Sequence, residues 1–251
     1  MIVKQFYTAC LSQASYFIES EGEVAIIDPS RDIDHFLEKA NSSKSKIKYI
    51  FQTHFHADFV SGHITLSKIT KAPIIYGPNA DPSYECIISK DGDTFKVGDC
   101  IIKVIHTPGH TLGHMVYHFE EQSLAFVGDT LFAMGCGRLF EGTPEQMWSS
   151  LNIIKEWPEK TQLFCAHEYT QANAEFALTV DPDNEALLKR KIDVENLRNS
   201  NQPTVPTTLS IEKDTNPFLR SNDSNIKAHL GMSQSSDLET FAEIRKRKDN
   251  F

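Results

Sequence analysis

The sequence predicts an α/β fold in which two packed sheets carry helices on their outer sides, followed by a small helical region. Two observations lead to this prediction. Up to about residue 129, short apolar runs rich in β-branched residues alternate with a few segments of helical spacing. From about residue 171 onward, apolar residues recur mainly at helical spacing. We therefore expect a larger domain over residues 1–170 and a helical domain over residues 171–251.

The first part of the chain is predicted to form a series of strands. Residues 14–20 and 23–29 flank a glycine-containing turn, which indicates a β-hairpin. Helical spacing is found over residues 33–43 and, less regularly, over residues 60–70. Further strands are expected over residues 46–52, 72–77, 93–98, 100–106, 114–119, 123–129 and 161–168.

A helix start is indicated near residue 144. Thr143 is suited to the N-cap, Pro144 to the first helical position, and Gln146 closes a capping box. We expect this helix to run to about residue 157. More helices are expected over residues 171–180, 184–199 and 237–251, and the Pro- and Thr-containing segment 201–218 is expected to be a connection.

The composition is that of a globular protein and narrows the choice of partner. The chain has 251 residues, of which 40% are hydrophobic and 24% charged. Its 25 Lys and Arg residues against 34 Asp and Glu give a formal charge of −9, so no nucleic-acid partner is expected. Five scattered cysteines without a CxxC pair favour a reducing compartment. Because we find no apolar leader and no run of membrane-spanning length, we expect a cytoplasmic protein without membrane contact. We also expect a monomer.

His54, His56 and Asp58 occupy alternate positions directly after a predicted strand. In an extended segment alternate side chains face the same way, so these three side chains can converge. Imidazole and carboxylate groups are ligands suited to zinc, iron or manganese. A polar loop with incidental histidines is the alternative interpretation of this stretch taken alone.

Three later polar residues also follow predicted strands. They are His110 in a Gly- and Pro-rich turn, Asp129 in the stretch FVGDTLF, and His167 in the stretch FCAHEYT. Strand ends that face one edge of a sandwich can build a site from residues far apart in the sequence. The sequence therefore predicts a metal site at one edge of the packed sheets.

Four motifs in this order, THxHxD, TPGHTxGH, GDTLF and HEYT, resemble those of the metallo-β-lactamase superfamily. The stretches GDTLFAMGCGRLFEGTPEQM and AHEYTQANAEFAL resemble the glyoxalase II family, the hydroxyacylglutathione hydrolases, more closely. The likeness covers roughly residues 50–251. It implies a four-layered αββα sandwich with a helical C-terminal domain.

The resemblance also implies a site for two metal ions. His54, His56 and His110 would bind the first ion, Asp58 and His167 would bind the second, and Asp129 would bridge the two. In the family a histidine directly follows the aspartate of the first loop, whereas Phe59 stands there in this chain and cannot coordinate a metal. Either the second ion binds weakly through the remaining ligands and water, or one ion suffices. His63 is a further candidate nitrogen donor, with a surface position as the alternative.

The N-terminal third resembles a different branch of the same superfamily. The stretches KQFYTACLSQASYFIES, IIDPSRDID and THFHADFVSGH are similar to those of persulfide dioxygenases. That resemblance implies a single iron held by two histidines and one aspartate, here His54, His110 and Asp129. Such a ligand set with open positions suits non-haem iron and oxygen chemistry.

The resemblance to glyoxalase II implies hydrolysis of a glutathione thioester, such as S-lactoylglutathione, to glutathione and D-lactate. One or two divalent ions, zinc first and iron or manganese as alternatives, would lower the pKa of bound water and stabilise the oxyanion. Asp58 and Asp129 are the catalytic candidates, with Asp58 as a general base if it binds no second ion. The alternatives are oxidation of glutathione persulfide, or a protein that binds glutathione conjugates with little turnover.

The C-terminal segment is expected to bind the glutathione part of the substrate. Arg245 and Lys248 are spaced i,i+3 and share a helix face, and the resemblance implies that they hold the glycine carboxylate. Arg138 and Tyr169 would complete this pocket, and Phe140 stands where some relatives have a tyrosine hydroxyl. A solvated helix end, favoured by the helix dipole, is the alternative interpretation of the RKRK run.

Overall fold

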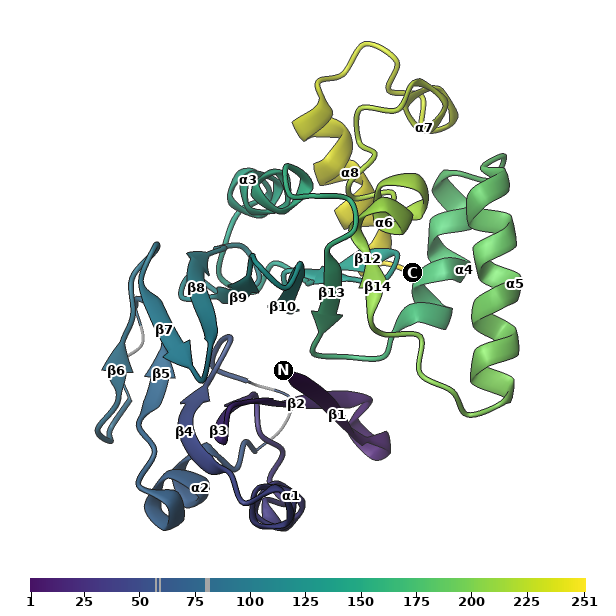
Figure 1. Cartoon of the computed structure of the whole chain (residues 1–251). Coiled ribbons are helices and arrows are strands. Elements are labelled where there is room, and N and C mark those ends of the chain that lie inside the picture. The colour runs from purple at the N-terminus through teal and green to yellow at the C-terminus, as the bar shows by residue number, and fades with distance from the viewer. Residues whose placement is uncertain (57, 59, 80–81) are drawn as a thin grey trace.

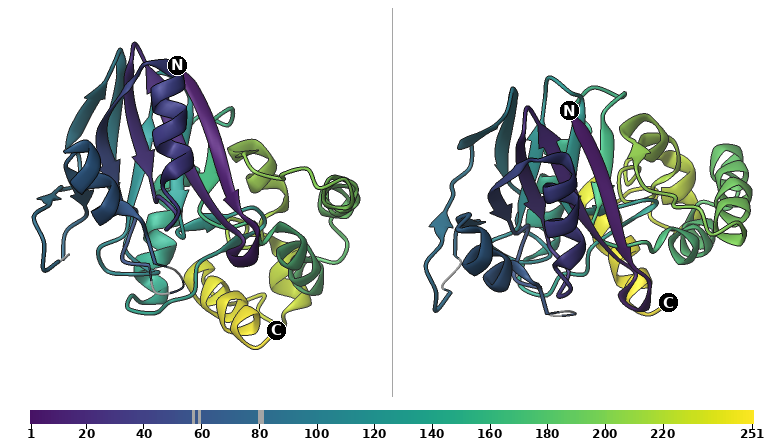
Figure 2. Two further views of the ribbon diagram at one scale, coloured as in Figure 1. Left: turned by 90° about the horizontal axis from the view of Figure 1, so that it is seen from below. Right: turned by 60° about the horizontal axis from the view of Figure 1, so that its bottom comes forward.

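Two mixed sheets packed face to face form the centre of the structure, with helices on both outer faces (Figure 1). The computed structural model describes residues 1–56, 58, 60–79 and 82–251. Helices α1 and α2 cover the outer face of the first sheet, and α3 and α8 cover that of the second. The remaining C-terminal helices lie on one side of the sandwich (Figure 2). The αββα fold class expected from the sequence is confirmed.

The first sheet has the strand order β1-β2-β3-β4-β5-β6. The pairs β1–β2 and β2–β3 are antiparallel and the other pairs are parallel. Its strands are β1 (Ile2–Thr8), β2 (Gln13–Ser20), β3 (Glu23–Ile27), β4 (Lys46–Phe51), β5 (Ile74–Tyr76) and β6 (Ile87–Ile88). Parallel strands need a crossover, and α1 (Asp34–Ser43) and α2 (His63–Thr70) supply the first two.

The second sheet has the order β14-β13-β10-β9-β8-β7, and only its β10–β13 pair is parallel. Its strands are β7 (Thr94–Val97), β8 (Cys100–His106), β9 (Met115–Phe119), β10 (Leu124–Gly128), β13 (Gln162–Cys165) and β14 (Thr207–Thr208). A separate hairpin consists of β11 (Leu131–Phe132) and β12 (Gly135–Cys136). The later helices are α3 (Pro144–Lys155), α4 (Thr170–Val180), α5 (Glu185–Asn199), α6 (Leu209–Thr215), α7 (Ser224–His229) and α8 (Asp237–Asp249), and a short 3-10 helix covers Ala9–Leu11.

Apolar side chains of the first sheet alternate between two buried layers. Ile27 and Phe51 point between the sheets, where they pack in one cluster with Tyr117. Ile26 and Ile50 point to the opposite face and pack in the cluster beneath α1 and α2. Because both faces of this sheet are buried, its strands consist of continuous apolar runs. Polar residues follow at the strand ends, at one edge of the sandwich.

The elements predicted from the sequence are present, with ends that differ by at most three residues. The predicted hairpin is the antiparallel pair β2–β3, and Thr143 and Gln146 form the expected capping box at α3. The segment 201–218 differs, because it contains β14 and α6 in addition to connections. The prolines of this segment led us to expect a connection, although a seven-residue helix follows them. The Thr208 hydroxyl is the N-cap of this helix and accepts the N–H of Ile211. Strands β1, β6, β11 and β12 and helix α7 were also not predicted.

The hairpin β11–β12 is fastened to the C-terminal helices by hydrogen bonds to its main chain. The Asn173 amide donates to the Ala133 carbonyl (3.0 Å), and the Arg245 guanidinium donates to that of Cys136 (2.8 Å). The Asn216 amide donates to the carbonyls of Phe132 and Gly135 (both 3.1 Å). Since the hairpin lies between Asp129 and Arg138, the C-terminal helices help to set the position of both.

Glu212 completes this fastening from inside the core. Its carboxylate is fully buried, accepts the N–H of Met134 (2.8 Å) and is paired with the Arg190 guanidinium.

Within the part of the chain that the structure describes, no helix combines the length and the apolar content needed to cross a membrane.

Candidate active site

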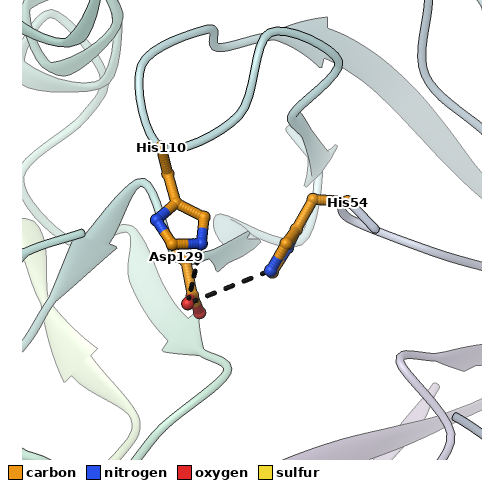
Figure 3. A group of neighbouring side chains, drawn as sticks. All are labelled: His54, His110 and Asp129. Carbon is orange, nitrogen blue, oxygen red and sulfur yellow. Dashed lines mark ion pairs between the residues drawn. The ribbon is translucent and has the colours of Figure 1, made fainter. Parts of the chain in front are cut away.

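Polar residues at four strand ends meet at one edge of the sandwich. His54 follows β4, His110 follows β8, Asp129 follows β10 and His167 follows β13, and all four are buried. The imidazoles of His54 and His110 point toward the Asp129 carboxylate (Figure 3). The Asp129 Oδ2 lies 4.0 Å from the His54 Nε2 and 3.4 Å from the His110 Nε2. One ligand atom from each of these three residues lies within 4.8 Å of the others.

These separations fit a metal ion better than direct hydrogen bonds. Two donor atoms about 2.1 Å from a tetrahedral ion lie about 3.4 Å apart, whereas N–H···O hydrogen bonds are usually below about 3.2 Å. The second oxygen of Asp129, Oδ1, is buried and accepts no hydrogen bond from any residue that the structure describes. Imidazoles and a carboxylate are also the donor types that suit zinc and iron. We conclude that the residues present fit a divalent ion.

Hydrogen bonds fix the ring proton of two of these histidines away from Asp129. The Thr53 hydroxyl donates to Asp28 Oδ2 (2.7 Å), so it accepts from His54 Nδ1 (2.9 Å). His110 Nδ1 donates to the Arg138 carbonyl (2.9 Å). Each ring therefore presents the lone pair of its Nε2, as a neutral metal ligand does.

Asp28 is a site residue that sequence reasoning missed. Its backbone has φ +48°, and its carboxylate accepts both the N–H (2.8 Å) and the hydroxyl of Thr53. The Asp28 Oδ1 also lies 3.1 Å from His56 Nε2, and the rings of His56 and His54 are 4.2 Å apart. Asp28 thus lies between Thr53 and His56, whereas the ligand atoms found within 4.8 Å of one another belong to His54, His110 and Asp129 and not to His56. The only sequence signal was an aspartate at the end of a strand before proline.

Asp58, His167 and Asp129, the residues expected to bind a second ion, also lie together, and we call them the second ligand group. Among the described residues, however, only His54, His110 and Asp129 have ligand atoms that all lie within 4.8 Å of one another. The His167 Nε2 lies 3.0 Å from Asp58 Oδ2 and 3.8 Å from Asp129 Oδ1. Asp129 thus presents one oxygen to each group, as a bridging ligand would. The Tyr169 ring stacks parallel on His167 at 4.9 Å. Phe59, where the sequence lacks the expected histidine, lies outside the described residues.

The charges in the site follow from burial and from these pairs. Burial, reinforced by the nearby His56, lowers the pKa of His54 well below its usual value, which favours the neutral ligand form. Burial alone would lower the pKa of His167, but the hydrogen bond to Asp58 and the negative charges of Asp129 and Asp58 together outweigh it, and the pKa is raised. Burial alone would raise the pKa of Asp58, but the same hydrogen bond together with the nearby His167 and His56 lowers it, so Asp58 is ionised.

His63 is held apart from the ligand groups. It is buried, and its Nε2 is hydrogen-bonded to the hydroxyls of Tyr84 (2.7 Å) and Tyr76 (3.3 Å). Burial lowers the pKa of His63 to about 4. The surface position expected for His63 is wrong. Its Nε2 is engaged by two tyrosines, whereas its Nδ1 is buried and has no hydrogen-bond partner among the described residues.

A pocket of about 680 Å³ extends from the metal ligands to the C-terminal helix α8. Its walls include Asp58, His110 and Asp129 at one end and all five residues expected to bind substrate, Arg138, Phe140, Tyr169, Arg245 and Lys248. One end of the pocket is therefore acidic and carries the metal ligands, and the other is cationic. This polarity suits a ligand with carboxylates at one end and the reacting group at the other.

Arg245 and Lys248 differ in how they face this pocket. Arg245 is only 3% exposed, and its guanidinium donates to the Cys136 carbonyl (2.8 Å) and to Asp249 (2.9 Å). Lys248 is half-buried, with its Nζ 3.3 Å from the Ala172 carbonyl. The solvated helix end considered for the RKRK run is therefore wrong for Arg245, although Lys246 and Arg247 are exposed.

Comparison with known proteins identifies the family. Residues 8–85 and 87–167 match the metallo-beta-lactamase superfamily, and residues 168–251 match the family described as hydroxyacylglutathione hydrolase C-terminus. A hydroxyacylglutathione hydrolase from Maricaulis maris is 46% identical over 257 residues, covering 100% of this chain and 99% of its own. The chain belongs to the hydroxyacylglutathione hydrolase family.

Other hydroxyacylglutathione hydrolases and solved structures agree with this result. The enzyme of that name from Rhizobium etli is 48% identical and covers 92% of this chain and 90% of its own. A metallo-beta-lactamase structure from Staphylococcus aureus has a TM-score of 0.69 and 28% identity, covering 98% of this chain and 70% of that one. ETHE1 from Myxococcus xanthus has a TM-score of 0.74 at 23% identity, covering 99% and 92%, which shows the shared fold. The expected family and the expected hydrolase class are confirmed.

Proposed function

We propose that this hydroxyacylglutathione hydrolase cleaves the thioester of a small 2-hydroxyacyl glutathione, such as S-lactoylglutathione, to glutathione and D-lactate. The observation that supports it most is the single pocket of about 680 Å³ that joins the metal-ligand edge to Arg138 and Lys248. Glutathione carries two carboxylates and suits the cationic end. A thioester placed between the ends would then lie beside Asp58 and Asp129.

The residues at the acidic end divide the chemistry among them. A divalent ion held by His54, His56, His110 and Asp129 would supply a Lewis acid that lowers the pKa of water and stabilises the oxyanion. Asp58 lines the pocket and is oriented by His167, so it is placed to accept the proton of the attacking water. Lys248 and Arg138 bind the carboxylates, and Tyr169 lies alongside them on the pocket wall.

The ion is zinc in this proposal, with iron or manganese as alternatives, and the second ligand group binds more weakly than the first. Asp58, Asp129 and His167 supply donors to that group, but the phenylalanine at position 59 supplies none. We also propose that residues 171–251 act as the glutathione-binding domain, although β14 from this segment completes the second sheet. A cytoplasmic location, a monomeric state and the absence of a nucleic-acid partner stay predictions.

Replacing Phe59 by histidine is expected to raise the metal content from about one ion to about two ions per chain. The new imidazole would add the donor that the second group lacks. Elemental analysis of both proteins, purified side by side without added metal, measures this ratio. Phe140→His, a substitution of the same kind elsewhere in the pocket, is the control and is expected to leave the ratio unchanged. An unchanged ratio for Phe59→His would contradict our account of the second group.

Raising the pH above 8 is expected to weaken substrate binding through Lys248. Burial, with Arg245 and Arg138 adding to it and Glu175 opposing it, lowers the pKa of Lys248 to about 8. Lysine is charged below its pKa, so the cation that pairs with the carboxylate is lost as the pH rises. We expect kcat/KM to fall roughly tenfold from pH 7 to pH 9 through a rise in KM.

The Lys248→Arg enzyme separates this effect from other titrations. Arginine stays charged throughout this range, so the profile of kcat/KM is expected to flatten above pH 8. Lys246→Arg, on the exposed side of the same helix, is expected to keep the wild-type profile. A Lys248→Arg profile as steep as that of the wild type would contradict the role of Lys248.

A second function is favoured by one specific observation. His54, His110 and Asp129 are two histidines and one carboxylate, and their ligand atoms lie within 4.8 Å of one another. This set suits a single non-haem iron that oxidises glutathione persulfide. Assaying purified protein for thioester cleavage and for persulfide-dependent oxygen uptake distinguishes the two. Oxygen uptake without cleavage would overturn the proposed hydrolysis.

A further inference from the structure

His114 is a buried histidine beside the metal ligands that belongs to neither ligand group. It directly precedes β9 and is fully buried. Its ring stacks on His54, with centroids 5.0 Å apart and planes 19° from parallel. Its Nε2 accepts the backbone N–H of Asp129 at 3.0 Å. One ring therefore contacts a ligand from the first sheet and the main chain of the shared ligand from the second.

The hydrogen bonds of His114 allow only one tautomer. A backbone N–H can only donate, so Nε2 carries the lone pair and the ring proton is on Nδ1. The Nδ1 lies 3.1 Å from the Thr107 hydroxyl and 3.0 Å from the Thr130 hydroxyl, and either can accept this proton. These two hydroxyls are themselves 2.9 Å apart. Both ring nitrogens are thus satisfied, and the ring cannot flip without losing these bonds.

The turn that carries Asp129 fits closely against the same ring. Gly128 has φ +50°, and a Cβ built there would lie 2.7 Å from the His114 Nε2 and 2.8 Å from the Thr53 Cβ. The turn is closed by the Thr130 N–H, which donates to the Val127 carbonyl (3.0 Å). Any side chain at position 128 would clash with the ring, so the main chain can come this close to His114 only because residue 128 is glycine. The ring thereby helps to set the position of the next residue, Asp129.

We propose that His114 is a positioning residue for the metal centre, which aligns Asp129 through its backbone N–H and His54 through ring stacking. This inference goes beyond the proposed hydrolysis, because it concerns metal affinity and holds whichever thioester is cleaved. Residues that orient metal ligands typically contribute a factor of about 10 to 100 in metal affinity. We attribute the contribution of His114 to metal affinity mainly to its Nε2, which accepts the backbone N–H of Asp129.

A matched pair of variants isolates that acceptor. Glutamine at position 114 can place its amide oxygen near the position of Nε2 and still accept the Asp129 N–H. Asparagine reaches only the position of Nδ1, so it keeps a donor for the threonines and loses the acceptor. We expect zinc binding to weaken at least about tenfold in His114→Asn and less than about threefold in His114→Gln. Competition between metal-free protein and a chromophoric chelator measures both affinities without substrate.

Two further measurements exclude a merely structural effect. The visible absorption of the cobalt-substituted protein is expected to shift in His114→Asn and to match the wild type in His114→Gln. His118→Gln is the control, because His118 is buried on β9 but stacks on Trp157 at 4.1 Å instead of on a ligand. We expect its zinc affinity to equal that of the wild type. Equal affinity in His114→Asn and wild type, or equal losses in the Asn and Gln variants, would overturn the proposal.

The tautomer can be tested without any substitution. Nitrogen-15 NMR of the wild-type imidazoles is expected to show His114 protonated on Nδ1 and unprotonated on Nε2, with and without zinc. The backbone N–H of Asp129 and the hydroxyls of Thr107 and Thr130 hold the two ring nitrogens, so the same tautomer is expected in both states. A proton on Nε2 would rule out the hydrogen bond from the Asp129 N–H and would overturn the proposal. This measurement uses only the wild-type protein, so it does not depend on whether the variants fold.

Discussion

His110→Ala is expected to abolish thioester hydrolysis, with kcat/KM falling by roughly a thousandfold or more. His110 contributes the nitrogen closest to Asp129 Oδ2, at 3.4 Å, so its loss removes one of the converging donors. The same ring donates to the Arg138 carbonyl and thereby links the metal ligands to the substrate pocket. The adjacent Thr111 and Phe140 offer no imidazole or carboxylate, and the carboxylate of Glu141, which also lines the pocket, accepts the N–H of Leu112 (2.7 Å).

Two measurements distinguish this loss from unfolding. Steady-state hydrolysis of S-lactoylglutathione gives kcat/KM, and zinc titration of the metal-free protein gives the affinity, which is expected to fall with it. His106→Gln is the control, because His106 ends the same strand β8 and contacts the Leu112 carbonyl (2.7 Å), away from the ligands. We expect that variant to keep most of its activity. A His110→Ala enzyme that retains a tenth of wild-type activity would show that the reaction does not depend on this centre.

Glu212→Ala is expected to lower the free energy of unfolding by about 3–5 kcal/mol. The Glu212 carboxylate is fully buried and accepts the Met134 N–H (2.8 Å), the Thr207 hydroxyl (2.7 Å) and the Asn216 amide (3.0 Å). Its removal leaves the Arg190 guanidinium without its carboxylate partner and the Met134 N–H without its acceptor, in addition to a cavity.

Denaturant unfolding measures this loss as a lower midpoint with an unchanged slope. For a chain of this size the thermal midpoint should fall by about 2–4 °C for each kcal/mol. Glu195→Ala is the matched control, because Glu195 is partly exposed and pairs with Lys191 one turn away on α5, so its replacement should cost less than about 1 kcal/mol. If Glu212→Ala unfolded within 1 kcal/mol of the wild type, the hairpin β11–β12 would not depend on the C-terminal helices as described.

The strand ends that carry the site could be read from local patterns. Alternation at His54, His56 and Asp58 predicts one shared face, and the structure places two of their rings 4.2 Å apart. Spacing alone could not predict which distant residues meet there. Their position after strand ends grouped His110 and Asp129 with the first loop, and the structure places both with His54. The assignment of the ligands to two ions came from a family resemblance, and Phe59 falls outside the described residues.

The residues that were missed act through the fold rather than through a motif. Asp28 reads as the end of a strand, and its role follows from a left-handed backbone that turns its carboxylate toward His56. Glu212 lies on a seven-residue helix that is too short to show a full apolar repeat. Arg245 lines the pocket, but the sequence does not show that Phe218 and the Cys136 carbonyl also contact its guanidinium. Such packing depends on partners up to about a hundred residues away, which no local pattern records.

Anomalous X-ray diffraction from crystals of the active enzyme, recorded at the zinc, iron and manganese edges, tests the central claim most directly. The account predicts an anomalous peak bounded by the Nε2 atoms of His54 and His110 and by Asp129 Oδ2, with any second peak between His167 and Asp58 weaker. Crystals that hydrolyse the thioester but show no peak between His54, His110 and Asp129 would contradict it.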